Sequence, residues 1–401
     1  MIKFKYMKLD KSILTLFVIT CIYTGSFSQV PGAYDLDHYF PFLKNKNVGL
    51  VVNQTSLVGD VHLLDTLINL GVNVISIFSP EHGFSGTLNA GEYFNDSLYK
   101  QSIPIISLYG KNKKLKDQDL YNIDVMLFDI QDVGVRFYTY ISTLHYVMEG
   151  CAQHNVKLIV LDRFNPHAHY VDGPVLNKKH SSFVGMHPVP IIYGMTIGEY
   201  ALMINGEGWL KDNLVCDLFI VKNLLYSRSA PVDYVFSPSP SPNLRTMNAI
   251  SLYPSLCLFE GTLISVGRGT EIPFEIFGAP FLDEDKFPFS FLPKPNFGSN
   301  SPKYNNQLCY GWLLNSNEDA QYLYEDSGLN ALNLNYLIDA YQNTPNDYKT
   351  KFFNSFFNKL AGNDELQKQI VDGVDVLSIR KSWERDLIDF KAIRIKYLLY
   401  D

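Results

Sequence analysis

The sequence predicts an α/β fold built on a parallel sheet, followed by a smaller mixed part. Over the first 221 residues, short apolar runs alternate with amphipathic helical stretches. Each apolar run ends in a polar loop that carries Gly or Pro. Strands that alternate with helices pair in parallel through right-handed crossovers. We therefore expect a parallel sheet whose polar loops lie along one edge.

The apolar runs are short enough for buried strands, and amphipathic stretches lie between several of them. The predicted strands are residues 48–53, 73–78, 103–108, 125–128, 157–161 and 217–221, and the helices are 62–70, 139–154 and 195–209. In the last helix, Thr196 and Glu199 have the spacing of a capping box, which gives Glu199 a structural role.

A Ser-Pro segment at residues 237–243 ends this pattern, since its prolines exclude a regular helix. We take it as a domain boundary, with an N-terminal catalytic domain over 29–236 and a C-terminal α+β domain over 237–401. Residues 283–310 are rich in Pro, Asn and Phe, so we expect loops there. The expected C-terminal helices are 332–341, 352–360, 365–371 and 379–399.

Residues 1–28 have the composition of a signal peptide. Four lysines precede an apolar run over 13–23, and a small-x-small site ends at Ser28. We expect cleavage after Ser28 and an exported protein, either periplasmic or released. An uncleaved anchor and lipidation at Cys21 are the alternatives, although Val-Ile-Thr before Cys21 is a poor lipidation context. No other stretch is long and apolar enough to span a membrane.

Charge and cysteine content narrow the class of protein. The formal net charge is −7, and removal of the +3 carried by residues 1–28 leaves −10. Such an acidic chain is a poor candidate for binding nucleic acid. The remaining cysteines lack C-x-x-C spacing, so we interpret them as buried free thiols, although export would permit some pairing. They are Cys151, Cys216, Cys257 and Cys309.

The sequence predicts no cofactor and no metal. It has no G-x-G-x-x-G after the first strand, no P-loop, no G-x-S-x-G and no H-E-x-x-H. His167 and His169 have the spacing of a metal clamp, but no further ligands are apparent, so we interpret them as polar loop residues.

Residues 124–143 form the stretch around which the site is predicted. An apolar strand ends there in a turn that carries six polar side chains, whereas helix capping needs only one or two. The carboxyl ends of parallel strands share one sheet edge, where α/β proteins bind ligands. We therefore expect the polar residues that follow the strands to converge: Asn53, Glu81, His82, Asp129, Asp132, Arg136, Asp162 and Arg163.

The carboxylates at this edge suit glycoside cleavage, which needs an acid to protonate the leaving oxygen and a second group at the sugar carbon. Glu81, held between Pro80 and His82, is the predicted acid, and we include His82 in the catalytic set. Asp129 and Asp132 are candidates for the second group. The structural alternatives are that Glu81 caps the next segment and that one aspartate only anchors Arg136.

Arginines and tyrosines supply the predicted substrate contacts. A guanidinium grips a carboxylate through two parallel hydrogen bonds, so Arg136, Arg163 and Arg268 suit an anionic ligand. Tyr138 and Tyr140 can stack on a sugar ring or stabilise charge, although plain packing explains them equally well.

Eight motifs in order resemble the DUF1343 family and its NamZ group of exo-β-N-acetylmuramidases. They are SPEHGFSG (79–86), FDIQDVGVRFYTYIST (128–143), VLDRFNP (160–166), DGPVL (172–176), FVG (183–185), YGMTIGEYA (193–201), SPSPN (239–243) and LFEG with GRGT (258–270). The resemblance covers nearly the whole chain after residue 28. It implies a Rossmann-like domain joined to a smaller one, with the site in the cleft between them.

The resemblance also implies a substrate: the terminal, non-reducing N-acetylmuramic acid of peptidoglycan fragments of the MurNAc-GlcNAc type. By motif position, Glu81, Asp129, Asp132 and Tyr138 belong to the catalytic set. The substrate-binding set is Asn53, Arg136, Tyr140, Asp162, Arg163, Asn243, Glu260 and Arg268. Arg136 and Arg268 are expected to hold the carboxylate of the lactyl ether.

Two other functions remain open from the residues alone. One is a muropeptide-binding protein without catalytic activity, against which the retained PEHG motif speaks, since a binder needs no proton donor. The other is a cell-wall amidase or esterase, whose weak point is the lack of a recognisable activated nucleophile.

Overall fold

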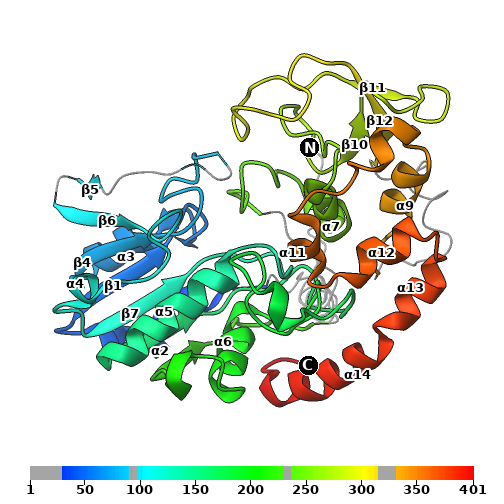
Figure 1. The fold of residues 1–401 in the computed structure, drawn as a ribbon. Coiled ribbons are helices and arrows are strands. Elements are labelled where there is room, and N and C mark those ends of the chain that lie inside the picture. Colours follow the sequence, from blue (N-terminus) through cyan, green and yellow to red (C-terminus); the bar gives the residue numbers. More distant parts are fainter. Residues whose placement is uncertain (1–28, 90–91, 93–96, 101, 229–235, 315–330) are drawn as a thin grey trace, which may run out of the picture.

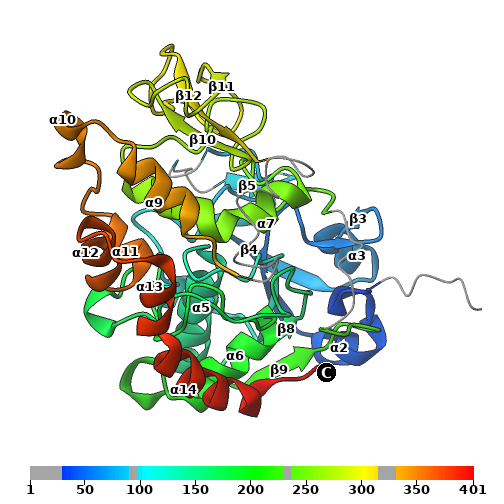
Figure 2. The ribbon, with the colours of Figure 1, turned by 90° about the vertical axis from the view of Figure 1, so that its right-hand side faces the viewer.

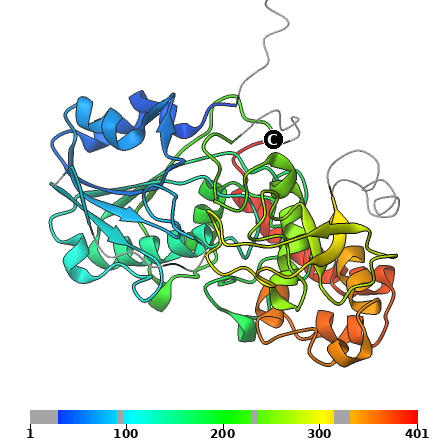
Figure 3. The same cartoon turned by 90° about the horizontal axis from the view of Figure 1, so that it is seen from above.

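The computed structural model describes residues 29–89, 92, 97–100, 102–228, 236–314 and 331–401. Two lobes lie side by side (Figures 1 and 3). The sheet lobe holds the first nine strands, and the C-terminal lobe holds a second sheet and a group of helices. The predicted signal peptide and Cys21 lie outside the described residues, so export stays a prediction.

The sheet lobe contains a seven-stranded sheet in the order β5-β6-β4-β1-β7-β8-β9. All neighbours pair in parallel except β5, which is antiparallel to β6. The six parallel strands, numbered along the chain, stand in the Rossmann order 3-2-1-4-5-6, as expected. The strands are β1 (Asn47–Val52), β4 (Asn73–Ser79), β5 (Ser97–Tyr99), β6 (Ile103–Ser107), β7 (Val125–Asp129), β8 (Lys157–Leu161) and β9 (Leu218–Val221).

Both faces of this sheet are covered, which explains why its strands are continuous apolar runs. Side chains alternate between faces, so Leu127 packs into the core on one side and Phe128 into the core on the other. Helices α2 (Leu36–Leu43) and α3 (Leu63–Asn69) contribute to the Leu127 face. Helices α5 (Tyr140–His154) and α6 (Ile197–Gly206) contribute to the Phe128 face.

The predicted capping box at the start of α6 is confirmed. The Glu199 N–H donates to Thr196 Oγ1 over 3.2 Å, and the Thr196 N–H donates to Glu199 Oε2 over 2.8 Å. Smaller elements complete the lobe. They are β2 (Leu57–Val58), β3 (Val61–His62), α4 (Asp117–Leu120) and the 3₁₀ turns Gly32–Tyr34, Lys178–His180 and Lys211–Asn213.

The C-terminal lobe is α+β, as predicted. The helix predicted over 365–371 is confirmed, the one over 332–341 is confirmed with shifted ends, and the one over 352–360 begins only at Phe357. An antiparallel sheet in the order β10-β12-β11 occupies part of the region expected to be loops. Its strands are too short to show a clear alternation in a Pro-rich segment. The lobe contains α7 (Met247–Leu256), the 3₁₀ turn Cys257–Gly261, β10 (Ile276–Ala279), β11 (Phe289–Phe291), β12 (Cys309–Leu313), α9 (Asn335–Gln342), α10 (Asn346–Lys349), α11 (Phe357–Ala361) and α12 (Glu365–Val371).

The last predicted helix, 379–399, is wrong as a single element. It is α13 (Val376–Ser382) and α14 (Glu384–Arg394), followed by the 3₁₀ turn Ile395–Tyr397. Trp383 separates the two helices with φ −108° and ψ 4°, and its buried indole holds the bend against the core. The bend turns α14 back under α6 of the sheet lobe (Figures 1 and 2).

The chain end therefore returns to the sheet lobe. The Leu399 N–H donates to Glu199 Oε1 over 2.7 Å, and Tyr400 Oη donates to Asp162 Oδ2 over 2.6 Å. One hydrophobic core also runs through both lobes, from Phe128 to Phe277. The lobes are therefore joined by packing as well as by the chain.

In the part of the chain that the structure describes, no helix has the length and apolar character needed to cross a membrane. All four cysteines after residue 28 are buried and free, as expected.

Candidate active site

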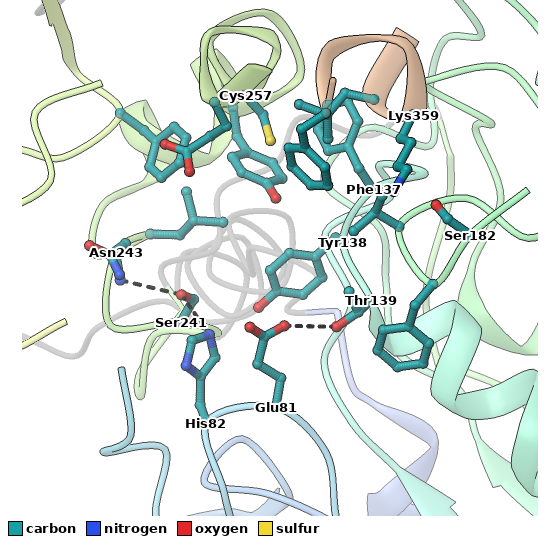
Figure 4. Close-up of a pocket in the computed structure, with 18 of the residues that line it drawn as sticks. Glu81, His82, Phe137, Tyr138, Thr139, Ser182, Ser241, Asn243, Cys257 and Lys359 are labelled. Carbon is teal, nitrogen blue, oxygen red and sulfur yellow. Dashed lines mark hydrogen bonds between the residues drawn. The ribbon is translucent and has the colours of Figure 1, made fainter. Parts of the chain in front are cut away.

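A cavity of about 400 Å³ lies between the lobes. Loops at the carboxyl ends of β4, β6 and β7 form one side, and the C-terminal lobe forms the other (Figure 4). Its lining consists of Glu81, His82, Tyr109, Lys113, Phe137, Tyr138, Thr139, Ser182, Phe183, Val184, Ser241, Asn243, Leu244, Tyr253, Cys257, Glu260, Arg268, Phe274, Phe356, Lys359 and Leu360.

Glu81 rises from the loop after β4, and its carboxylate points into this cavity (Figure 4). Thr139 Oγ1 donates a hydrogen bond of 3.0 Å to Glu81 Oε2. The next two residues, His82 and Gly83, have φ of 72° and 76°. A left-handed histidine costs ~1–3 kcal/mol, and such strain is concentrated at functional sites. The turn it makes presents Glu81 over the sheet edge.

His82 is buried beside Glu81 and is held in one tautomer. Its Nδ1 lies 2.8 Å from the Leu88 carbonyl, which can only accept, so Nδ1 carries the hydrogen. Nε2 then accepts from Ser241 Oγ over 3.2 Å. Burial lowers the pKa of His82, although the charge of Glu81 acts in the opposite direction. His82 is therefore a neutral imidazole that orients the Glu81 loop against the Ser-Pro segment.

Tyr138 lines the cavity, and Tyr140 lies beneath it. Both hydroxyls donate to the Pro240 carbonyl, over 2.8 and 3.2 Å, and the two rings meet edge to face at 4.7 Å. Asn53 is fully buried and donates to Tyr140 Oη over 3.1 Å. Of the three residues, only Tyr138 is placed to touch a ligand. Asn53 and Tyr140 instead support the Ser-Pro segment from below, which corrects their predicted substrate-binding role.

Glu260 and Arg268 form an ion pair in the wall of the C-terminal lobe. Arg268 Nε lies 3.2 Å from Glu260 Oε1, and the guanidinium lies over the Phe274 ring. Burial alone would raise the pKa of Glu260, but the positive charges of Arg268 and Lys303 outweigh it and lower that pKa. Glu260 is therefore an anion.

Arg136 does not line the cavity, which corrects its predicted role as a substrate contact. It is fully buried and donates to four backbone carbonyls over 2.7–2.8 Å. Two of them, Leu360 and Ala361, end α11, where a cation is favourable. Burial lowers the pKa of Arg136 to about 9. This arginine fixes the C-terminal lobe to the sheet lobe.

Asp129 and Arg163 pair with each other instead of facing a ligand. Arg163 donates from Nε to Asp129 Oδ1 over 2.6 Å and from Nη2 to Oδ2 over 2.9 Å, and both side chains are buried. The side-chain alternation of β7 explains the outcome. Asp129 follows Val125 and Leu127 on the face covered by α2 and α3, away from the Phe128 face to which Tyr138 contributes. Neither residue has its predicted position at the ligand.

Asp132 and Asp162 are also buried beneath the cavity, contrary to the prediction. Asp132 Oδ2 accepts from the Gly134 N–H and from Tyr193 Oη, and burial raises the pKa of Asp132 to about 6. Asp162 accepts from the start of α6, including the Gly198 N–H at 2.8 Å, and burial raises its pKa to about 7. Both aspartates hold loops in place.

Six of the thirteen predicted site residues thus line the cavity: Glu81, His82, Tyr138, Asn243, Glu260 and Arg268. Sequence reasoning missed several others. Thr139 and Ser241 lie inside two of the motifs quoted above, so the predicted site residues beside them in the chain could have identified them. Lys113 lies in a Lys-rich loop after a predicted strand. No local signal marks Phe356 or Lys359, because their position depends on how α11 packs. Among the described residues, no group of three or more His, Cys, Asp or Glu side chains is arranged to hold a metal ion.

Comparison with known proteins assigns the chain to a family. Two family models match almost end to end: the N-terminal model of exo-beta-N-acetylmuramidase NamZ over residues 48–248, and the C-terminal model over 251–400. The chain belongs to the NamZ family. The resemblance to DUF1343 proteins drawn from the motifs is confirmed.

Relatives of the NamZ family agree in sequence and in fold. The chain is 37% identical over 382 residues to the peptidoglycan beta-N-acetylmuramidase NamZ of Bacillus subtilis strain 168, covering 91% of this chain and 89% of that protein. A DUF1343 protein of Bacteroides fragilis NCTC 9343 superposes with a TM-score of 0.83 at 41% identity, covering 93% of this chain and 99% of that one. A second from the same organism gives 0.77 at 26%, covering 94% and 100%.

Proposed function

We propose that this protein is an exported glycosidase that releases the N-acetylmuramic acid at the non-reducing end of peptidoglycan fragments of the MurNAc-GlcNAc type. The main support is one observation within a NamZ family fold: Glu81 presents its carboxylate to the cavity between the lobes. The B. subtilis relative is named as a peptidoglycan beta-N-acetylmuramidase, and the matching family models as exo-acting ones.

In this proposal Glu81 is the general acid/base that protonates the leaving oxygen. Its hydrogen bond from Thr139 fixes the carboxylate, and the buried His82 keeps the loop in place. The second group is Glu260, because Asp129 and Asp132 do not reach the cavity. Arg268 and Lys303 keep Glu260 ionised, so it suits the stabilisation of positive charge at the sugar carbon.

The test is Glu81→Gln, which keeps the shape of the side chain but removes the acid. General acid/base groups contribute ~10²–10⁴-fold, so release of N-acetylmuramic acid from a MurNAc-GlcNAc disaccharide, whose sugar leaving group needs a proton, should fall by that factor. Glu271→Gln is the matched control, since Glu271 is exposed and outside the cavity lining, and it should keep the parent rate. An active Glu81→Gln enzyme would reject the assignment.

Acyl hydrolysis is a second candidate, and one contact favours it. Ser241 Oγ donates to His82 Nε2, which is the pairing that activates a serine nucleophile. The two candidates differ in their products. Mass analysis after incubation with a muropeptide gives free N-acetylmuramic acid, still carrying any peptide, for a glycosidase, and a released peptide or acyl group for an acyl hydrolase.

Export is proposed on the composition of residues 1–28 alone. The expected result for the natively expressed protein is a mature chain that begins at Gln29 and is found in the periplasmic or released fraction. A chain that keeps Met1 and stays in the cytoplasmic fraction would contradict it.

A further inference from the structure

Two lysines line the cavity without a carboxylate partner among the described residues. Lys113 comes from the loop after β6, and Lys359 comes from α11 of the other lobe. Among the described residues, no Asp or Glu lies within ion-pair distance of either ammonium, and the lining carboxylates are Glu81 and Glu260. Two like charges from separate lobes repel each other, and an anion between them would remove the repulsion.

The chain neighbour Lys114 shows what a structural lysine looks like here. Lys114 pairs with Glu149 over 2.7 Å, lies 4.7 Å from the centre of the Tyr146 ring and does not line the cavity. The Lys113 ammonium also lies over a ring, 4.5 Å from the centre of Phe183, but this ring and Lys113 itself are part of the lining. An aromatic face holds an ammonium in position without neutralising it. The Lys113 side chain is therefore held in place without a carboxylate partner among the described residues.

The lining next to Phe183 holds an unsatisfied hydroxyl. Ser182 Oγ is buried and has no hydrogen-bond partner within the described ranges, although buried polar atoms nearly always have one. Ser182 precedes Phe183 in the chain, and Figure 4 shows it on the same side of the cavity as Lys359. The lining thus contains two ammonium groups and one hydroxyl for which the described residues provide no acceptor.

We propose that Lys113, Lys359 and Ser182 form the subsite for the carboxylate of the lactyl ether of N-acetylmuramic acid. This rests on the proposed function, since that carboxylate is the one ionised group of a terminal sugar that carries no peptide. Arg136, expected to take this role, is buried, and Arg268 already donates to Glu260. The subsite would let the enzyme distinguish a muramic acid from a glucosamine terminus, which lacks the lactyl group.

The test pairs each lysine with a change in the substrate. The substrates are 4-nitrophenyl β-N-acetylmuramide and its lactyl carboxamide, which has the same shape without the charge. Lys113→Met and Lys359→Met should each raise KM for the acid about tenfold, the scale of one hydrogen bond to a charged group. Lys114→Met and Lys351→Met are the controls outside the lining, and they should keep the parent KM.

The comparison between the acid and the carboxamide decides whether the lysines bind the carboxylate. For the parent, KM for the carboxamide should exceed KM for the acid by about the factor by which the double lysine variant raises KM for the acid. On the carboxamide itself, the lysine variants should have the same KM as the parent. Equal losses on acid and carboxamide, or no loss on either, would overturn the subsite. Ser182→Ala should raise KM for the acid about threefold, which is the scale of a weaker hydrogen bond.

Calorimetric titration separates this proposal from the proposed function, because it needs no turnover. The parent should bind free N-acetylmuramic acid at least tenfold more tightly than N-acetylglucosamine, and Lys113→Met and Lys359→Met should remove that difference. If the parent shows this preference but releases no nitrophenol, the subsite holds and the glycosidase assignment fails. If the parent turns over the muramide but the lysine variants keep the binding preference, the subsite fails alone.

Discussion

Two loops at the same sheet edge differ in what they do with polar residues. The loop after β4 presents the Glu81 carboxylate to the cavity. In the loop after β7, Asp132 and Arg136 are instead buried in hydrogen bonds to the protein itself. A dense group of polar side chains at a strand end can satisfy itself and lock segments together. The Glu81 carboxylate, on a strained turn, points into the cavity instead.

The largest effect is expected from replacing Arg136, which tests whether the loop after β7 holds the two lobes together. Arg136→Met leaves four buried carbonyls without their donor, so we expect a loss of about 3–5 kcal/mol in the free energy of unfolding. Urea unfolding measures it. Arg385→Met removes an exposed helical ion pair and should cost at most about 0.5 kcal/mol. Equal, small costs for the two variants would show that the β7 loop is not a lock.

Asp129→Asn tests the buried ion pair between Asp129, at the end of β7, and Arg163. The Arg163 guanidinium would keep a buried charge without its counter-ion, and breaking such a pair costs roughly 3–5 kcal/mol. The Asp129→Asn variant should lose far less turnover than Glu81→Gln, because neither Asp129 nor Arg163 lines the cavity. Thermal unfolding and kcat on the MurNAc-GlcNAc disaccharide give both values. A folded, stable but inactive Asp129→Asn enzyme would restore Asp129 as a catalytic candidate.

Asp162 makes the stability of the sheet lobe depend on pH. Its pKa is raised by burial from 3.8 to about 7, so between these values the folded protein binds more protons than the unfolded one. Stability therefore falls as the pH rises from about 4 to about 7, by roughly 1.4 kcal/mol for each unit of pKa difference. Urea unfolding at pH 4.5 and 7.5 should show a smaller decrease for Asp162→Asn than for the parent. Buried histidines with lowered pKa act oppositely, but they are common to both proteins.

The smallest effect is expected at Ser241. Ser241→Ala removes one neutral hydrogen bond to His82, worth about 0.5–1.5 kcal/mol, so kcat/KM on the muramide should fall less than about tenfold. This measurement shows how much the hydrogen bond between Ser241 and His82, which holds the loop after β4, contributes to the positioning of Glu81. Complete loss of activity would instead identify Ser241 as a nucleophile and favour acyl hydrolysis.

Much of the sheet lobe was predictable because its strands are buried on both faces, which gives apolar runs such as Val125–Asp129 a clear signal. The same period would have placed Asp129 on the face of Leu127, away from the cavity. Position at a strand end thus predicts that a residue is near the site, but not that it points into it. Lys359 and Phe356 had no local signal, since their place depends on contacts between distant parts of the chain. The three-residue strand β11 is too short for any periodicity.

The bend at Trp383 has a practical consequence. By turning α14 back to the first sheet, it brings Asp401 beside Arg228, whose N–H donates to the Asp401 carbonyl over 2.8 Å. The C-terminal lobe is thus attached to the sheet lobe at both of its ends, through the Ser-Pro segment and through the residues after α14. An affinity tag fused after Asp401 would press on that second attachment, so expression vectors should leave this end bare.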